Sequence, residues 1–91
     1  MPEGDDTTKA EPLAHRRKRL YMRSIRRGIK EMDLILTSYA DARLAQMDED
    51  ALTLYDQFLG ENDHDLYQWV TAQTATPEPY AALVADIQKL I

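Results

Sequence analysis

One residue constrains this chain more than any other: Gly28, which lies in a stretch of otherwise strong helix-forming residues. Inside a helix a glycine costs about 1 kcal/mol relative to alanine, so it marks either a helix end or a close approach of another backbone. Arg26 and Arg27 precede it and suit a helix C-terminus, where cations are favoured. Glu31 and Asp33 follow it and suit the first turn of a second helix, where anions are favoured. We therefore predict that a helix ends at Arg27 and that Gly28 takes a positive φ.

The alternative is a single long helix that continues through Gly28. It is supported by apolar residues spaced three or four apart across the glycine: Tyr21, Ile25, Ile29, Met32 and Leu36. In both interpretations Gly28 and Glu31 lie within one helical turn of each other, with Arg27 beside them.

The rest of the chain also has helical periodicity, and no segment alternates apolar and polar residues over the length of a strand. The predicted helices are 13–27, 29–46, a third capped by Asp48 and ended by Gly60, a fourth capped by Asn62 or Asp63, and a fifth from Thr76 and Pro77 to the chain end. Residues 1–12 contain two prolines and no periodicity, which predicts a disordered tail. The predicted fold class is all-α: a compact five-helix bundle, with residues 13–91 as one domain.

Each predicted helix has one apolar face. In the first helix we expect an inward face and an outer face of arginine; the inward residues are Leu13, Leu20, Tyr21, Ser24 and Ile25. The second helix buries Ile29, Met32, Ile35, Leu36, Tyr39, Ala40 and Leu44. The later helices place in the core Leu52, Tyr55, Phe58, Leu59, Leu66, Trp69, Val70, Tyr80, Leu83, Val84, Ile87 and Leu90.

The charge is distributed unevenly. The net charge is −5, yet eight of the eleven Lys and Arg residues lie between Arg16 and Lys30, and no acid lies between Glu11 and Glu31. A chain with one basic segment in an acidic remainder is suited to docking on a partner surface. The alternative is a basic helix that is solvated and binds nothing.

Composition and motifs exclude several functions. There is no cysteine, and His15 and His64 have no metal-ligand spacing around them, so we predict no metal site. No apolar run is long enough to span a bilayer, and we predict no integral membrane segment. Phosphate-binding loops and recognisable catalytic sets are absent from the sequence, so the chain is not expected to be an enzyme.

A small nucleic-acid-binding regulator that uses the basic first helix is the alternative function. A basic helix next to a second helix is typical of helix-turn-helix proteins. The isoelectric point of about 4.8 argues against it, because acidic helices repel phosphate. We therefore expect no nucleic-acid partner.

Two motifs identify a family. The first is the run from Arg23 to Leu36, which contains Arg-Gly-x-x-Glu at Arg27, Gly28 and Glu31. The second is Asp-x-Asp-Leu-x-x-Trp at 63–69, followed by Pro77. Over residues 18–91 the chain resembles the succinate dehydrogenase assembly factor 2 (SdhE) family. The resemblance implies a small all-helical protein that binds the flavoprotein subunit of succinate dehydrogenase, or of the related fumarate reductase, and promotes its covalent flavinylation with FAD.

The resemblance also implies where the partner binds. It places Arg27, Gly28 and Glu31 on the docking surface, and we add their neighbours Arg26 and Asp33. An arginine offers donors to a carboxylate or carbonyl, a glutamate accepts hydrogen bonds, and a glycine admits a close backbone. We expect the arginine and the glutamate of the motif to face outward.

The remaining expectations concern cofactor, assembly state and compartment. FAD belongs to the client protein, and no residue of this chain is assigned to bind it. The chain is expected to be a monomer. Its compartment is expected to be the cytoplasm, or the mitochondrial matrix in a eukaryote.

Overall fold

The computed structural model describes residues 11–91. These residues form five α-helices and two 3-10 helices, and none of them lies in a strand: α2 (Leu13–Ser24), α3 (Lys30–Arg43), η1 (Leu44–Gln46), α4 (Glu49–Leu59), α5 (Asp63–Val70), η2 (Glu78–Tyr80) and α6 (Ala81–Lys89). The predicted all-α bundle of five helices is confirmed. Apart from Glu11 and Pro12, the predicted disordered tail lies outside the described residues.

The break between the first two helices is confirmed, but its position and geometry differ from the prediction. Helix α2 ends at Ser24, Ile25 is extended, and Arg26 takes the positive φ of 58°. No glycine has a positive φ among the described residues, so that expectation for Gly28 was wrong. The Arg27 guanidinium donates to the carbonyl oxygen of Arg23 at 2.8 Å. This bond satisfies a carbonyl in the last turn, which allows the helix to end before the arginine pair.

Residues with short polar side chains cap the N-termini of two of the later helices. Asp48 caps α4, where its side chain accepts a hydrogen bond from the amide of Ala51 at 2.8 Å. Asn62 caps α5 through the amide of His64, so Asp63 is not the cap. The hydroxyl of Thr76 caps no helix: η2 begins after Pro77, without a side-chain cap.

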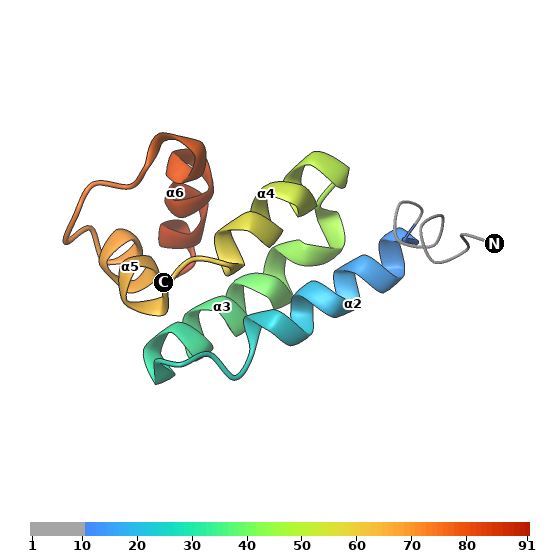
Figure 1. The fold of residues 1–91 in the computed structure, drawn as a ribbon, viewed down its shortest axis with the longest axis horizontal. Coiled ribbons are helices and arrows are strands. Elements are labelled where there is room, and N and C mark those ends of the chain that lie inside the picture. The colour runs from blue at the N-terminus through green and yellow to red at the C-terminus, as the bar shows by residue number, and fades with distance from the viewer. Residues whose placement is uncertain (1–10) are drawn as a thin grey trace.

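The helices pack around α3 and α4. Helix α2 lies against both, α5 contacts α3 and α6, and η2 contacts α4 (Figure 1). Helices α2 and α3 run side by side, and the turn that joins them lies at one end of the molecule (Figure 1). The Arg-Gly-x-x-Glu motif begins in this turn and ends in the first turn of α3.

The core is continuous and centres on α4. Its fully buried side chains come from all five helices and include Leu20, Met32, Leu36, Leu52, Tyr55, Phe58, Leu66 and Ile87. Some expected core positions are more exposed than predicted. Leu13 and Leu90 are 38% and 39% exposed, because they lie near the ends of α2 and α6. Ile25 and Trp69 are only partly buried.

Candidate functional site

The candidate site is the turn between α2 and α3, together with the first turn of α3. Arg26 and Gly28 are exposed in the turn, and Glu31 is exposed on α3. Asp33 is partly buried, and its carboxylate accepts a hydrogen bond from the Thr37 hydroxyl at 3.3 Å. The structure thus brings all five predicted site residues to one end of the molecule, and three of them, Arg26, Gly28 and Glu31, are exposed.

Arg27, the fifth, does not face outward as expected. Its side chain is only 11% exposed, and all three of its guanidinium nitrogens donate within the chain. Besides the Arg23 carbonyl, it reaches the Leu59 carbonyl at 3.0 Å and the Asp63 carboxylate at 2.8 Å. Arg27 therefore ties the end of α2 to the end of α4 and the start of α5.

Asp63 is a residue of this site that sequence reasoning missed, because it was taken for a helix cap. Its second carboxylate oxygen, Oδ2, accepts a hydrogen bond from the Gly28 amide at 2.8 Å. A Cβ on Gly28 would lie only 2.9 Å from that oxygen. A contact within the chain therefore favours glycine at this position, because a side chain would displace the Asp63 carboxylate. The sequence held one sign of the role of Asp63: Asn62, directly before it, can cap α5 by itself, so Asp63 is not needed as the cap.

A hollow of about 400 Å³ opens beside the turn. It is lined mainly by the turn itself, with contributions from α2 and α5: Met22, Arg23, Ile25, Arg26, Arg27, Gly28 and Asp63. Met22 is 50% exposed, so the hollow has an apolar edge next to its charged groups. A mixed surface of this kind is suited to a protein partner.

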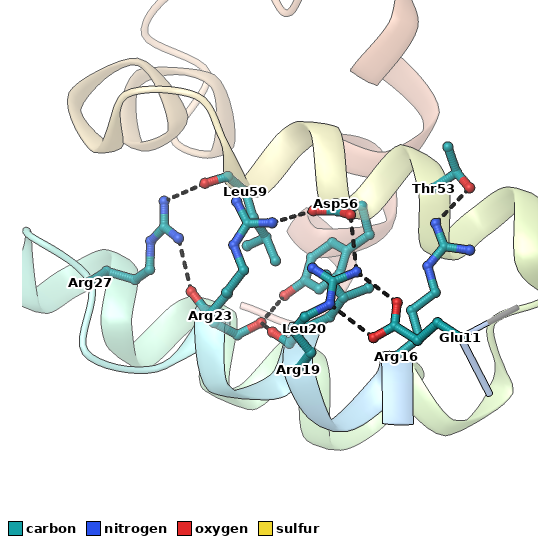
Figure 2. Close-up of polar contacts among 11 residues, drawn as sticks. Glu11, Arg16, Arg19, Leu20, Arg23, Arg27, Thr53, Asp56 and Leu59 are labelled. Atoms are coloured by element: carbon teal, nitrogen blue, oxygen red, sulfur yellow. Dashed lines mark hydrogen bonds and ion pairs between the residues drawn. The ribbon is translucent and has the colours of Figure 1, made fainter. Parts of the chain in front are cut away.

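Arg27 and four arginines of α2 make contacts within the chain, and we call these five residues the arginine row: Arg16, Arg17, Arg19, Arg23 and Arg27. Figure 2 shows four of these side chains reaching from α2 and the turn toward α4: Arg16, Arg19, Arg23 and Arg27. Arg16 donates to the Thr53 hydroxyl at 2.7 Å, and Arg19 and Arg23 both pair with Asp56. Arg17 donates to the carbonyls of Leu44 and Met47.

The sequence predicted that the arginines form the outer face of the first helix. This prediction was wrong, because the arginines of the row face other parts of the chain. Their guanidinium groups hold α2 against α4 and the segment before it. The alternative nucleic-acid function requires these groups to be free for phosphate contacts. The five arginines of the row, on which this alternative function depended, instead make hydrogen bonds or ion pairs within the chain. Lys18, Arg26 and Lys30 remain exposed, which is a small basic surface.

A second hollow of about 400 Å³ lies between α3, α4 and α6, at the other end of α3 from the candidate site. At its edge the Asp86 carboxylate accepts hydrogen bonds from the Tyr39 hydroxyl at 2.8 Å and from Arg43 at 3.1 Å. These bonds lower the pKa of Asp86 below its ordinary value. The three polar groups thus bond to one another at the edge of the hollow.

Two further findings concern residues 11–91. No group of three or more His, Cys, Asp or Glu residues in this range is arranged to hold a metal ion. None of the helices in it is both long enough and apolar enough to cross a bilayer.

Short helices around one core define the class of small all-helical proteins. Residues 18–91 match the family described as Flavinator of succinate dehydrogenase (Sdh5), and the chain belongs to this family. The resemblance found in the sequence is confirmed.

Relatives with similar sequences come from fungi and insects. The chain is 51% identical over 61 residues to "Succinate dehydrogenase assembly factor 2, mitochondrial" of Penicillium rubens, an alignment that covers 67% of this chain and 20% of the relative. It is 41% identical over 83 residues to the protein of the same name from Drosophila virilis, covering 89% of this chain and 51% of the relative. The chain thus spans between about a fifth and a half of the length of these relatives.

Proposed function

We propose that this chain is an assembly factor that binds the flavoprotein subunit of succinate dehydrogenase and promotes its covalent flavinylation. The observation that carries the proposal is the family match over residues 18–91, which includes both motifs and nearly the whole described fold. Fumarate reductase, which has a related flavoprotein subunit, is the second client that we propose. The compartment we propose is the mitochondrial matrix, or the cytoplasm in a bacterium; the names of the relatives describe those proteins as mitochondrial.

The exposed part of the turn supports a docking role. The Glu31 carboxylate lies in the first turn of α3 and accepts hydrogen bonds from donors on a partner. Arg26, the residue with positive φ, is exposed, so its guanidinium is available to a carboxylate or carbonyl on a partner. Gly28, between them in sequence, has no side chain to hold a partner backbone away.

The role that we propose is positional. The assembly factor binds mobile parts of the client and holds them so that the client's own side chain and its bound FAD are in reacting geometry. FAD supplies the flavin that becomes attached, and it belongs to the client. The factor acts as a monomer and contributes a surface, with no catalytic group of its own.

The test is a matched pair of glutamate variants. Glu31→Ala removes the carboxylate from the docking surface, whereas Glu49→Ala removes an exposed carboxylate from the first turn of α4. Both variants should melt within a few degrees of the wild type, because exposed charges are worth less than about 1 kcal/mol. Only Glu31→Ala should lower capture of the purified apo-flavoprotein and its covalent flavin content, read as flavin fluorescence in a denaturing gel. Equal flavin incorporation with both variants would contradict the proposal.

A further inference from the structure

The Asp63 carboxylate joins two neighbouring residues of the docking turn from a helix far along the chain. Its Oδ1 atom accepts from Arg27 Nε at 2.8 Å, and its Oδ2 atom accepts from the Gly28 amide at 2.8 Å. Both side chains of the ion pair are largely covered, with Asp63 19% and Arg27 11% exposed. We call this arrangement the Asp63 bridge.

The turn depends on side chains for its conformation. Ile25 is extended, Arg26 has a positive φ, and the segment up to Ile29 is not helical. The amides of Arg26, Arg27 and Gly28 donate to no main-chain carbonyl in the turns and loops that the structure describes. A non-glycine residue in the left-handed region is unfavourable and persists only where surrounding contacts hold it. The Asp63 bridge and the other two bonds of Arg27 are those contacts.

We propose that Asp63 is a positioning residue of the docking surface. It does not face the partner; it fixes the backbone from Arg26 to Gly28 so that Arg26 and Glu31 are presented together. On this inference Arg27 belongs to the bridge and not to the residues that contact the partner. Gly28 is a glycine because the bridge occupies the space that a Cβ would need. The inference rests on the proposed function, since it concerns the same docking turn.

Asp63→Asn tests the bridge with little change of shape. Asparagine has one oxygen where aspartate has two, so its amide group must face either the Arg27 guanidinium or the Gly28 amide, and each of these is a donor. The matched control is Asp65→Asn, which removes an exposed carboxylate from the same first turn of α5. The probe is the purified apo-flavoprotein subunit of succinate dehydrogenase.

The first readout is local amide hydrogen exchange, which separates positioning from general stability. In Asp63→Asn the Gly28 amide should exchange about tenfold faster or more, because it loses a hydrogen bond to a charged acceptor. Buried amides of α4 should change far less, since the core is untouched. A uniform increase over the whole chain would mean a merely structural role and would overturn the inference. An unchanged Gly28 amide would overturn it too.

The second readout is affinity for the apo-flavoprotein, measured with Asp63→Asn, Asp65→Asn and Glu31→Ala side by side. We expect about tenfold weaker binding for Asp63→Asn, at a temperature where it is fully folded, and normal binding for Asp65→Asn. Weak binding by Glu31→Ala with normal binding by Asp63→Asn would overturn the positioning role and leave the proposed function intact. Normal binding by both variants would instead count against the proposed function itself.

Gly28→Ala provides a second variant should Asp63→Asn fail to fold. It keeps the carboxylate but displaces it, so it should weaken binding in the wild-type background. In an Asp63→Ser background the added methyl group meets no carboxylate, and alanine should then cause no further loss. If Gly28→Ala weakens binding equally in both backgrounds, the glycine is required by the partner and the Asp63 bridge does not explain it.

Discussion

Helix α4 is held on its two sides by different chemistry. Toward α2 it meets the arginine row through Thr53, Asp56 and the Leu59 carbonyl (Figure 2). Toward α5 and η2 it presents Phe58, whose ring lies beside the rings of Trp69 and Tyr80. Most contacts on the first side are polar and partly exposed, whereas the contacts on the second side are between aromatic rings that are largely buried.

The difference teaches which contacts supply stability and which supply orientation. Phe58 is fully buried and lies 5.4 Å from the Tyr80 ring and 6.3 Å from the Trp69 ring, centroid to centroid. Burial of large aromatic side chains dominates the energy of a core. Partly exposed ion pairs contribute little each, but they are directional and fix how α2 lies on α4. The docking turn lies at the end of the polar side, so these directional contacts also fix the orientation of the turn.

The largest effect should follow from opening the aromatic side. Phe58→Ala should lower the free energy of unfolding by about 3–5 kcal/mol, because it leaves a cavity between three rings. Trp69→Ala should cost less despite its larger side chain, since Trp69 is only partly buried. Urea unfolding followed by circular dichroism measures both. A larger loss from Trp69→Ala would show that the centre of the core lies nearer α5 than α4.

An intermediate effect should follow from removing Arg27, a well-covered member of the arginine row. Arg27→Ala loses charge-assisted bonds to three acceptors, and we expect a loss of about 1.5–3 kcal/mol in the free energy of unfolding. Its exposed neighbour serves as the control: Arg26→Ala should change stability by less than about 0.5 kcal/mol. Equal melting temperatures for the two variants would remove the distinction between a bridge residue and a contact residue.

The smallest effect should be a pH dependence at the exposed end of the row. The hydrogen bond from Arg19 lowers the pKa of Glu11 below its ordinary value of 4.5. A carboxyl whose pKa is lower in the folded chain stabilises the fold above its unfolded pKa, and this contribution is lost as the pH falls through the folded value. Stability should therefore decline in acid slightly more in the wild type than in Glu11→Gln.

Urea titrations from about pH 6 to about pH 3 measure this difference. The control is Glu78→Gln, which changes an exposed glutamate in η2, away from the arginine row. It should retain the acid slope of the wild type. If Glu11→Gln also retains it, the contact between Glu11 and Arg19 contributes nothing to stability in solution.

Periodicity was sufficient to predict the helices and most of the core. The spacing around Met32, Leu36 and Tyr39 predicted one buried face correctly, because a helix in a small bundle can bury only one stripe. Asp48 was predicted correctly as a cap because capping is local, between residues three apart. Helix ends were less predictable. The end of α2 depends on bonds that Arg27 makes with residues up to 36 positions away, which spacing does not reveal.

The sequence predicted where the candidate site lies, but it did not correctly predict which of its side chains are exposed. The motif indicated the turn, and Arg26, Gly28 and Glu31 are exposed there. The burial of Arg27 was not predictable, because an arginine that follows a helix has the same sequence signature whether it faces a partner or its own chain. Whether these residues bind the flavoprotein stays a prediction.

One buried contact between α2 and α4 is neither ionic nor apolar. The Ser24 hydroxyl donates to the Leu20 carbonyl at 2.8 Å, and its oxygen lies 2.6 Å from the Tyr55 hydroxyl. Ser24 and Tyr55 are both fully buried, and burial raises the pKa of Tyr55 to about 12. Losing the Ser24 hydroxyl alone leaves the buried Tyr55 hydroxyl without its partner, at a cost of about 1–3 kcal/mol, whereas losing the Tyr55 hydroxyl alone leaves Ser24 bonded to the Leu20 carbonyl. As the family diverges, the order of change at these two positions should therefore matter: a lineage that loses both hydroxyls should acquire phenylalanine at 55 before it loses the serine at 24.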